Sequence, residues 1–324
     1  MPRRAMRQPR TGVPRSDGWP TNAVRTSYLN DNDLGSGRDM YFRDLGGGHL
    51  AAFVTNYGLF NQDHHNADLA EQRTTPGATV CMEFAPIEAH GGTPASAPIV
   101  KFFVFVGAGG QQNAPRVTSA NLDGFGEKFV PNLCLNCHGG SYFPSDPPTF
   151  ADVDMDARFR ELDTATYLYP GGRVVPNATE EAAFKQQNLL VRNAGSGATA
   201  VAIRDLIAGW YPGASATQDN TYTPSGWAGS PEHDLYHDVV KGSCRTCHVA
   251  FDDDTSAGGV NWTTYDQLKA RHSFLKDFVL CSGRQMPHAV VTYRNFWLSA
   301  NPHRPAVLRT YADGAAWTAL GDCE

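Results

Sequence analysis

The chain lacks any apolar run of the roughly 18–20 residues that a membrane-spanning helix needs, so we expect no transmembrane span within its 324 residues. Lysine is also scarce, with six lysines among 27 cationic residues, and the formal net charge is −6 at pH 7. A chain with this charge has no overall basic field to attract a phosphate backbone. We therefore expect no binding to nucleic acid.

Cysteine is infrequent too, at seven residues, but four of the seven fall into two identical patterns. Cys134-Leu135-Asn136-Cys137-His138 and Cys244-Arg245-Thr246-Cys247-His248 are both C-x-x-C-H runs, the pattern that attaches a c-type haem. Two thiols three positions apart can each form a thioether with a haem vinyl group, while the adjacent imidazole binds the iron. Such a run should arise by chance about 0.005 times in a chain of this length and composition.

These two motifs predict two covalently bound haem c groups per chain. We expect thioethers at the four cysteines and one iron ligand from each motif histidine. The predicted cofactor-binding residues are Cys134, Cys137, His138, Cys244, Cys247 and His248.

Two C-x-x-C pairs could instead hold zinc or act as redox dithiols. Zinc sites of this kind usually separate their pairs by roughly 15–20 residues, whereas here the pairs are over a hundred residues apart. Zinc also gives no reason for a histidine directly after each pair. Haem attachment is therefore the favoured prediction.

Covalent haem attachment in bacteria takes place outside the cytoplasm, so the motifs predict a periplasmic or extracellular protein made with a secretory signal. The stretch from Met1 to Trp19 has scattered arginines among prolines and no apolar signal core. We expect either that the true start lies upstream or that the chain is a processed form.

Three cysteines lie outside the motifs, namely Cys81, Cys281 and Cys323. In an oxidising compartment the simplest expectation is one disulfide and one unpaired thiol. Cys281 and Cys323 share the C-terminal region, and their disulfide would close a loop of about 40 residues and stabilise the fold by about 3–4 kcal/mol. Cys81, inside an apolar run, is then a buried free thiol.

The pattern along the chain predicts an α+β fold. Strands are expected at Asp39–Asp44, His49–Tyr57, Thr79–Pro86 and Ile99–Val106, which are rich in Val, Phe and Tyr and separated by turn-forming residues. Helices are expected from Asn177 to Arg192 and at Thr199–Trp210, from Ser230 to Gly242, and at Tyr265–Leu280 and Ala289–Ala300.

We predict an N-terminal antiparallel β-rich domain followed by a loop-rich, mainly α-helical di-haem cytochrome c region. The expected division is a disordered tail at 1–25, a β-rich domain at 26–115, a first haem region at 116–213 and a second haem domain at 214–324.

Downstream of the second motif, the chain reaches Met286-Pro287-His288. A thioether favours ferrous iron relative to imidazole and so raises the haem potential, and a following proline stiffens the loop that holds the sulfur. We predict Met286 as the second axial ligand of this haem; the alternatives are His288, His272 or a residue from elsewhere in the chain.

Cys244–His248, the helix that follows and Met286-Pro287 resemble a class I-type cytochrome c domain, over about residues 230–324. The resemblance implies a helical haem pocket, residence outside the cytoplasm and one-electron transfer. The first motif resembles the c-type cytochromes only through Cys134–His138 and Gly139-Gly140.

The first haem has no clear distal ligand in the sequence. Residues 139–176 contain no histidine, and their one methionine, Met155, lies between two aspartates without a following proline. We expect the ligand to come from outside this segment, with a histidine favoured. The candidates are His64, His65, His90, Met155 and His272.

The leading functional prediction is a di-haem c-type cytochrome that carries single electrons between redox-partner proteins, without substrate turnover. The alternative is a di-haem peroxidase-type oxidoreductase, in which an open first haem would bind peroxide. The β-rich domain could also dock the cytochrome to a larger assembly.

Overall fold

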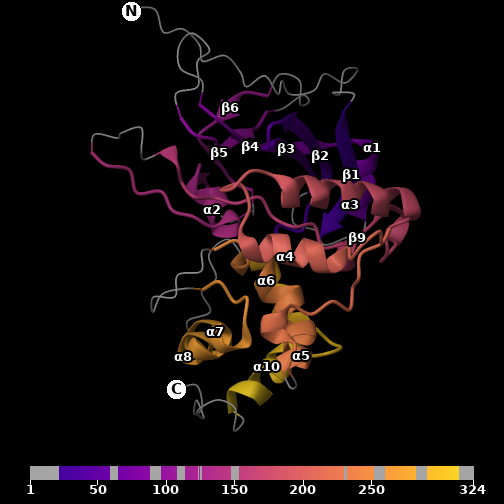
Figure 1. Ribbon diagram of the computed structural model, residues 1–324, viewed down its shortest axis with the longest axis vertical. Coiled ribbons are helices and arrows are strands. Elements are labelled where there is room, and N and C mark those ends of the chain that lie inside the picture. Colours follow the sequence, from indigo (N-terminus) through magenta and orange to yellow (C-terminus); the bar gives the residue numbers. More distant parts are fainter. Residues whose placement is uncertain are drawn as a thin grey trace, which may run out of the picture.

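The computed structural model describes residues 22–58, 65–87, 96–107, 114–122, 124, 126–146, 153–229, 232–251, 260–281 and 290–313. Within these ranges the fold is an antiparallel sheet with helices, as the α+β prediction required. In Figure 1 the sheet occupies one end of the molecule, α3 and α4 lie in the middle, and the short helices of the C-terminal part lie at the other end.

The main sheet has seven antiparallel strands in the order β6-β5-β4-β3-β2-β1-β9. A second, two-stranded sheet pairs β7 with β8. All four predicted strands are present as β2 to β5. The bounds are β1 Ala23–Asn30, β2 Gly37–Gly46, β3 His49–Tyr57, β4 Pro76–Ala85, β5 Ile99–Phe105, β6 Arg116–Val117, β7 Ser119–Ala120, β8 Lys128–Phe129 and β9 Tyr167–Leu168.

Strand β1 was not among the predicted strands, and its first residues fall inside the stretch predicted as a tail, 1–25, most of which lies outside the described residues. Strand β9 also joins the sheet from well beyond residue 115, by pairing with β1 at Leu29 and Asn30. The sheet therefore includes two strands, β1 and β9, that the local sequence pattern did not predict.

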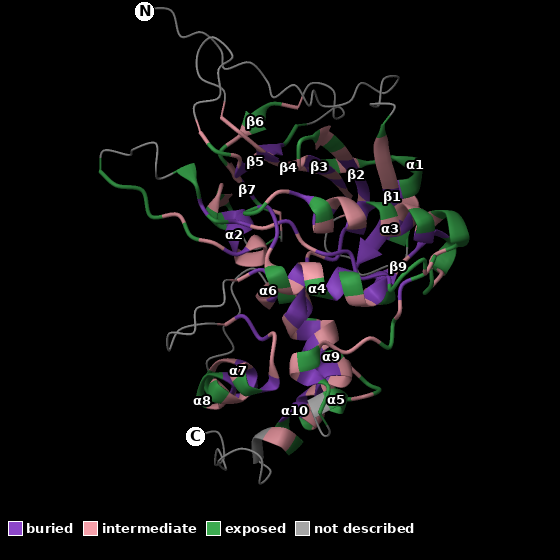
Figure 2. Ribbon diagram, viewed as in Figure 1, coloured by how far each residue is buried: buried purple, intermediate pink, exposed green. Residues whose placement is uncertain are grey.

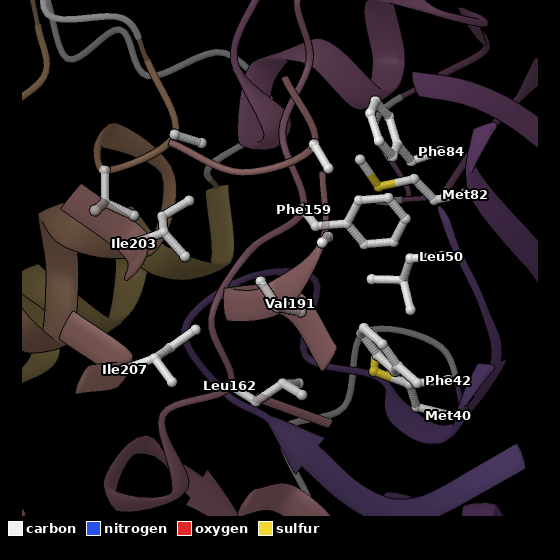
Figure 3. Close-up of a cluster of buried hydrophobic side chains, with 14 of the residues drawn as sticks. Met40, Phe42, Leu50, Met82, Phe84, Phe159, Leu162, Val191, Ile203 and Ile207 are labelled. Atoms are coloured by element: carbon white, nitrogen blue, oxygen red, sulfur yellow. The ribbon is translucent and has the colours of Figure 1, made fainter. Parts of the chain in front are cut away.

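One face of the sheet carries the main hydrophobic core. Because side chains alternate along a strand, Met40 and Phe42 of β2 share this face with Leu50 of β3 and with Met82 and Phe84 of β4. Figure 3 shows these residues facing a second layer made of Phe159, Leu162, Val191, Ile203 and Ile207.

The opposite face of the sheet is also buried, since Tyr41 and Phe53 stack there with ring centroids 5.0 Å apart. Helix α1, His65–Gln72, packs against β1 and β2. Just after α1, Arg73 reaches back to Asp39 of β2 with a nitrogen-to-oxygen distance of 3.1 Å. The sheet therefore has buried side chains on both of its faces.

The predicted helices are present, and two of them begin at the predicted capping boxes. Asn177 and Glu180 cap α3, and Thr264 and Gln267 cap α7. The bounds are α2 Asn132–His138, α3 Ala178–Asn193, α4 Val201–Trp210, α5 Glu232–Leu235, η6 Tyr236–Cys244, α6 Arg245–His248, α7 Tyr265–Ala270, α8 His272–Leu275, η7 Lys276–Leu280, α9 Val290–Leu298 and α10 Arg304–Asp313, with single 3₁₀ turns at Thr164–Thr166, Pro170–Gly172 and Ser225–Trp227.

Two of these elements, η6 and η7, are π-helices. The first leads directly into the second C-x-x-C-H motif, so α5, η6 and α6 form one continuous helical stretch from residue 232 to 248. The second completes the stretch from 265 to 280, which was expected as one helix but changes geometry at Arg271. π-Helical turns are rare and are often found at functional sites.

The described residues form two large hydrophobic clusters. The larger one joins the sheet, α3, α4 and the first motif, and it also includes Val249 and Ala250 after the second motif. The other gathers side chains of η6, α7, η7, α9 and α10 around Trp227 and Trp262. Figure 2 shows the buried positions running through the strands and along α4. The domain boundaries proposed from the sequence stay a prediction.

Among the described residues, no helix has both the length and the apolar character needed to cross a membrane.

Candidate haem-binding site

The two C-x-x-C-H turns lie against each other, although 110 residues separate their second cysteines in the sequence. Helices α2 and α6 are in contact, and the sulfur atoms of Cys137 and Cys247 are 3.6 Å apart. Both cysteines are half-buried, and their mutual contact lowers the pKa of Cys137 and raises that of Cys247. The structure therefore joins the two motifs into one site.

Two glycines make this close approach possible. Gly139 has φ of 69°, and a Cβ there would lie 2.1 Å from the carbonyl oxygen of Ala250, next to the second motif. Gly140 has φ of 77°, and a Cβ there would lie 2.0 Å from the carbonyl oxygen of Met155. Only glycine adopts this backbone without a steric clash, so Gly139 is the point where the two motif regions interlock.

The motif histidines are oriented in the same way. Nδ1 of His138 lies 2.9 Å from the carbonyl oxygen of Arg158, and Nδ1 of His248 lies 2.7 Å from that of Val260. Because a carbonyl oxygen only accepts, Nδ1 must carry the proton, which leaves the lone pair on Nε2. Neither Nε2 is hydrogen-bonded to a described residue.

Burial also keeps both imidazoles neutral. It lowers the pKa of His138 to about 4, assisted by the nearby positive charge of Arg160, and it lowers the pKa of His248 to about 4. A neutral imidazole with Nδ1 bonded to the backbone and Nε2 free is the form that binds a metal ion. Each motif therefore presents the donor that a haem iron needs.

The second motif borders open space. His248 lines a cavity of about 880 Å³ between α4 and the second motif, a volume within the ~300–1,000 Å³ range of small-molecule sites. Cys244 lines a separate apolar pocket together with Val239, Leu275 and Phe296. Trp262 lines both spaces and stacks on the His248 ring, with centroids 3.6 Å apart and planes 11° apart.

Three buried polar atoms beside this cavity have no hydrogen-bond partner, namely Nε1 of Trp262, Oδ1 of Asn261 and Nε of Arg245. All three residues line the cavity that His248 borders. A buried donor and a buried acceptor without partners are costly unless a bound group satisfies them. The second motif therefore fits haem c in its thiols, its imidazole and its surroundings.

The first motif is enclosed instead by the main core. Cys134 and Leu135 pack among the sheet residues, and burial raises the pKa of the Cys134 thiol to about 12. The His138 ring lies 5.5 Å from the ring of Phe102 on β5. The ligand set of thiols and neutral imidazole fits haem c here too, with the sheet as one wall.

Several residues that shape the site were missed from the sequence. Arg160, Glu161 and Asp163 lie in a stretch without secondary-structure periodicity, yet Glu161 and Asp163 are each 4% exposed. Arg245, inside the second motif, is equally buried and reaches back to this stretch, with its guanidinium donating to the Asp163 carboxylate. The one available signal was the run of charges itself, which usually indicates a solvated loop.

Three of the candidate distal ligands, Met155, His65 and His272, lie in the described residues. Met155 is buried, and its backbone pairs with Ser141 beside the first motif. The carbonyl of Arg158, three residues further on, faces Nδ1 of His138 and not Nε2. His65 is exposed at the start of α1, and His272 is half-buried at the start of α8.

His64, His90, Met286 and His288 lie outside the described residues, so their roles stay predictions. Among the described residues, no group of three or more His, Cys, Asp or Glu side chains could hold a metal ion. Cys81 is a free thiol, as predicted, but it is half-buried and not buried as expected. Cys281 is buried and disulfide-bonded, but Cys323 lies outside the described residues, so their pairing also stays a prediction.

No protein-family model, no curated protein and no solved structure matches this chain.

Proposed function

We propose that the chain is a di-haem c-type cytochrome in which single electrons pass between two adjacent haem groups. The observation that supports this most strongly is the 3.6 Å distance between the sulfur atoms of Cys137 and Cys247. Two groups attached at those sulfurs would begin within van der Waals distance of each other. Such closeness suits electron exchange inside the chain better than two independent sites.

Haem c, when bound, supplies a one-electron couple between ferric and ferrous iron. The residues of this chain would attach the haem groups, bind their irons and form their surroundings. Cys134, Cys137, Cys244 and Cys247 would hold the two groups covalently, and His138 and His248 would each present Nε2. The backbone carbonyls of Arg158 and Val260 keep the two imidazole rings oriented.

The surrounding residues also shield part of the site from water. Cys134 is buried in the main core, and Trp262 covers one face of the His248 ring. Where the site is enclosed and apolar, as around Cys134, less solvent rearranges when the charge changes, and that favours electron transfer over substrate turnover. We place the protein outside the cytoplasm, where redox-partner proteins would supply and accept the electrons.

The haem count tests the proposal directly. A pyridine haemochrome assay should return two haems per chain for the wild type and one for each double variant, Cys134→Ser with Cys137→Ser and Cys244→Ser with Cys247→Ser. Cys81→Ser is the matched control, because Cys81 is a free thiol on β4 that belongs to neither motif. Zinc in place of haem would refute the proposal.

Adjacency of the haems has its own test. Electron paramagnetic resonance of the oxidised wild type should show magnetic interaction between two irons, and this interaction should vanish in either one-haem variant. Spectra that equal the sum of the two one-haem variants would contradict electron exchange between adjacent groups. Binding of peroxide at the first haem would instead support the peroxidase alternative.

Met286 is proposed as the second ligand of the haem on Cys244 and Cys247. Met286→Ala should lower the potential of that haem or make it high-spin, with little response at the other haem. An unchanged spectrum would assign the position to another residue, with His288 and His272 as the candidates.

A further inference from the structure

A short buried segment, Arg158–Asp163, connects the two motifs; we call it the linking segment. At its start, the carbonyl oxygen of Arg158 accepts a hydrogen bond from Nδ1 of His138 at 2.9 Å. At its end, the Asp163 carboxylate accepts one from the guanidinium of Arg245, which belongs to the second motif. The linking segment thus contacts the first motif at one end and the second motif at the other.

The linking segment has no regular helix or strand, yet hydrogen bonds hold it along its length. The backbone N–H of Phe159 donates to the carbonyl of Ala198 at 2.7 Å. The side chain of Asn188 donates to the Leu162 carbonyl and accepts from the Leu162 N–H, each at 2.9 Å. Figure 3 shows Phe159 and Leu162 between the sheet and the helices. Neither end can therefore shift without disturbing packed neighbours.

Charges of opposite sign alternate between this segment and the second motif. Arg160 lies near Cys137 and Cys247, and its positive charge is paired with Glu161. Nε of Arg245 lies 3.7 Å from Oε1 of Glu161. Together with Asp163, these side chains form a buried row that begins at the contact between the motifs. Inside a protein such charges act over longer distances than they would in water.

Arg245 is fixed on its other sides as well. Its guanidinium donates to the Tyr236 hydroxyl at 2.7 Å and lies 5.2 Å from the centre of the Trp210 ring. Asp163 is held in turn by Gln218, which donates to it at 2.5 Å. The pair is therefore rigid, and its charges occupy defined positions beside the motifs.

We propose that the buried Asp163–Arg245 pair sets the reduction potentials at both motifs and acts as a positioning element that couples them. The inference rests on the proposed function, because it requires haem at both motifs. A carboxylate near an iron favours the ferric form, whose charge is more positive by one, and a guanidinium favours the ferrous form. Removing the two charges separately should therefore shift the potentials in opposite directions.

The test is a haem-resolved redox titration of four variants. Asp163→Asn should raise the potentials of both haems, and Arg245→Gln should lower both. The double variant Asp163→Asn with Arg245→Gln should show a smaller shift than either single variant, because the two losses of charge cancel. Arg245→Lys, which keeps the charge but not the planar fork of donors, should stay closer to the wild type than Arg245→Gln.

Asp39→Asn is the matched control. Asp39 is as buried as Asp163 and is also paired with arginines, at 2.6 Å from Arg25 and 3.1 Å from Arg73, but it lies on the side of the sheet near α1. Its loss should destabilise the fold without moving either potential. A shift equal to that of Asp163→Asn would show that the loss of any buried carboxylate has the same effect and would overturn the proposal.

The remaining outcomes separate this inference from the proposed function. Two haems in the wild type, with potentials that respond to neither Asp163→Asn nor Arg245→Gln, would refute the coupling alone. Shifts of the same sign in both variants would show loosened packing and would also refute it. Fewer than two haems in the wild type would refute the proposed function itself. If a single variant loses haem, the reduction potentials of the double variant and of Arg245→Lys are compared with those of the wild type instead.

Discussion

The two C-x-x-C-H motifs share a pattern of five residues, but the chain supports them in different ways. The first, on α2, is part of the main core, with the sheet on one side and a glycine pair directly after it. The second begins at the last residue of the π-helix η6, continues through α6 and borders a cavity of about 880 Å³. One motif is enclosed by backbone and sheet, and the other by aromatic and charged side chains.

Backbone carbonyls orient both motif histidines, so the two motifs differ in what surrounds them. His138 is oriented by the linking segment, which is itself held by the core. His248 is oriented by Val260, and its ring is covered by Trp262. We therefore expect backbone changes to affect the first motif most, and side-chain changes to affect the second motif most.

The largest expected effect follows from placing a side chain at the point where the motifs interlock. Gly139→Ala sets a Cβ against the Ala250 carbonyl and should reduce the free energy of unfolding by about 5 kcal/mol or more, in the exceptional tail of point substitutions. Chemical denaturation and the haem count measure this effect. Gly171→Ala is the control, since Gly171 has φ of 75° and open space around it, and it should cost only about 1–2 kcal/mol. Equal losses would contradict the interlock.

The next effect concerns the charge pair that supports the second motif. Arg245→Gln leaves Asp163 buried without its cation and should reduce the free energy of unfolding by about 3–5 kcal/mol. Arg173→Gln breaks a pair that is geometrically similar, at 2.6 Å from Glu180 but on the surface, and it should cost no more than about 1 kcal/mol. If urea denaturation gives similar losses, the buried pair does not hold the motif.

A smaller and more local effect should distinguish the aromatic neighbours of the two histidines. Trp262→Leu removes the ring stacked on His248 and should cost about 2 kcal/mol, with spectral changes at the second haem only. Phe102→Leu, beside His138, is its counterpart and should perturb only the first haem. Resonance Raman spectra of the two variants compare the sites. Changes at both haems in either variant would contradict the prediction that each aromatic residue affects only its own motif.

The smallest expected effect is a change in how stability depends on pH. Burial alone would raise the pKa of Asp163, but Arg245 and Lys241 outweigh it and hold this pKa below its usual value. Its contribution is therefore present above the unfolded pKa of about 3.9 and is lost as pH falls through the folded pKa. Asp163→Asn should make the acid limb of a stability–pH curve flatter than in the wild type.

Glu161 should affect the pH dependence of stability in the opposite direction to Asp163. Burial raises its pKa despite the neighbouring Arg160 and Arg245, so its contribution is lost as pH rises above about 4.3. Glu161→Gln should therefore flatten the curve on the side of rising pH. If both variants change the same limb, the two carboxyl groups do not differ as their surroundings imply.

Much of the fold could be predicted from local patterns. Strand β3 has the predicted bounds, His49–Tyr57, because its second half is rich in aromatic and β-branched residues and the strand lies between glycine turns. Helix α3 begins at Asn177 because that side chain accepts from the N–H groups of Thr179 and Glu180. Strand β1 was missed, since its pairing with β2 and β9 depends on partners that its own sequence does not specify.

The candidate site, like the fold, depends partly on local sequence and partly on tertiary contacts. The sequence by itself determined the two motifs, since the spacing of thiols and histidine is local chemistry that needs no fold to be read. Only the tertiary structure decided that Cys137 and Cys247 meet and that Asp163 pairs with Arg245. Contacts of this kind join positions more than 80 residues apart, and they arise from packing of the whole core, which no local pattern encodes.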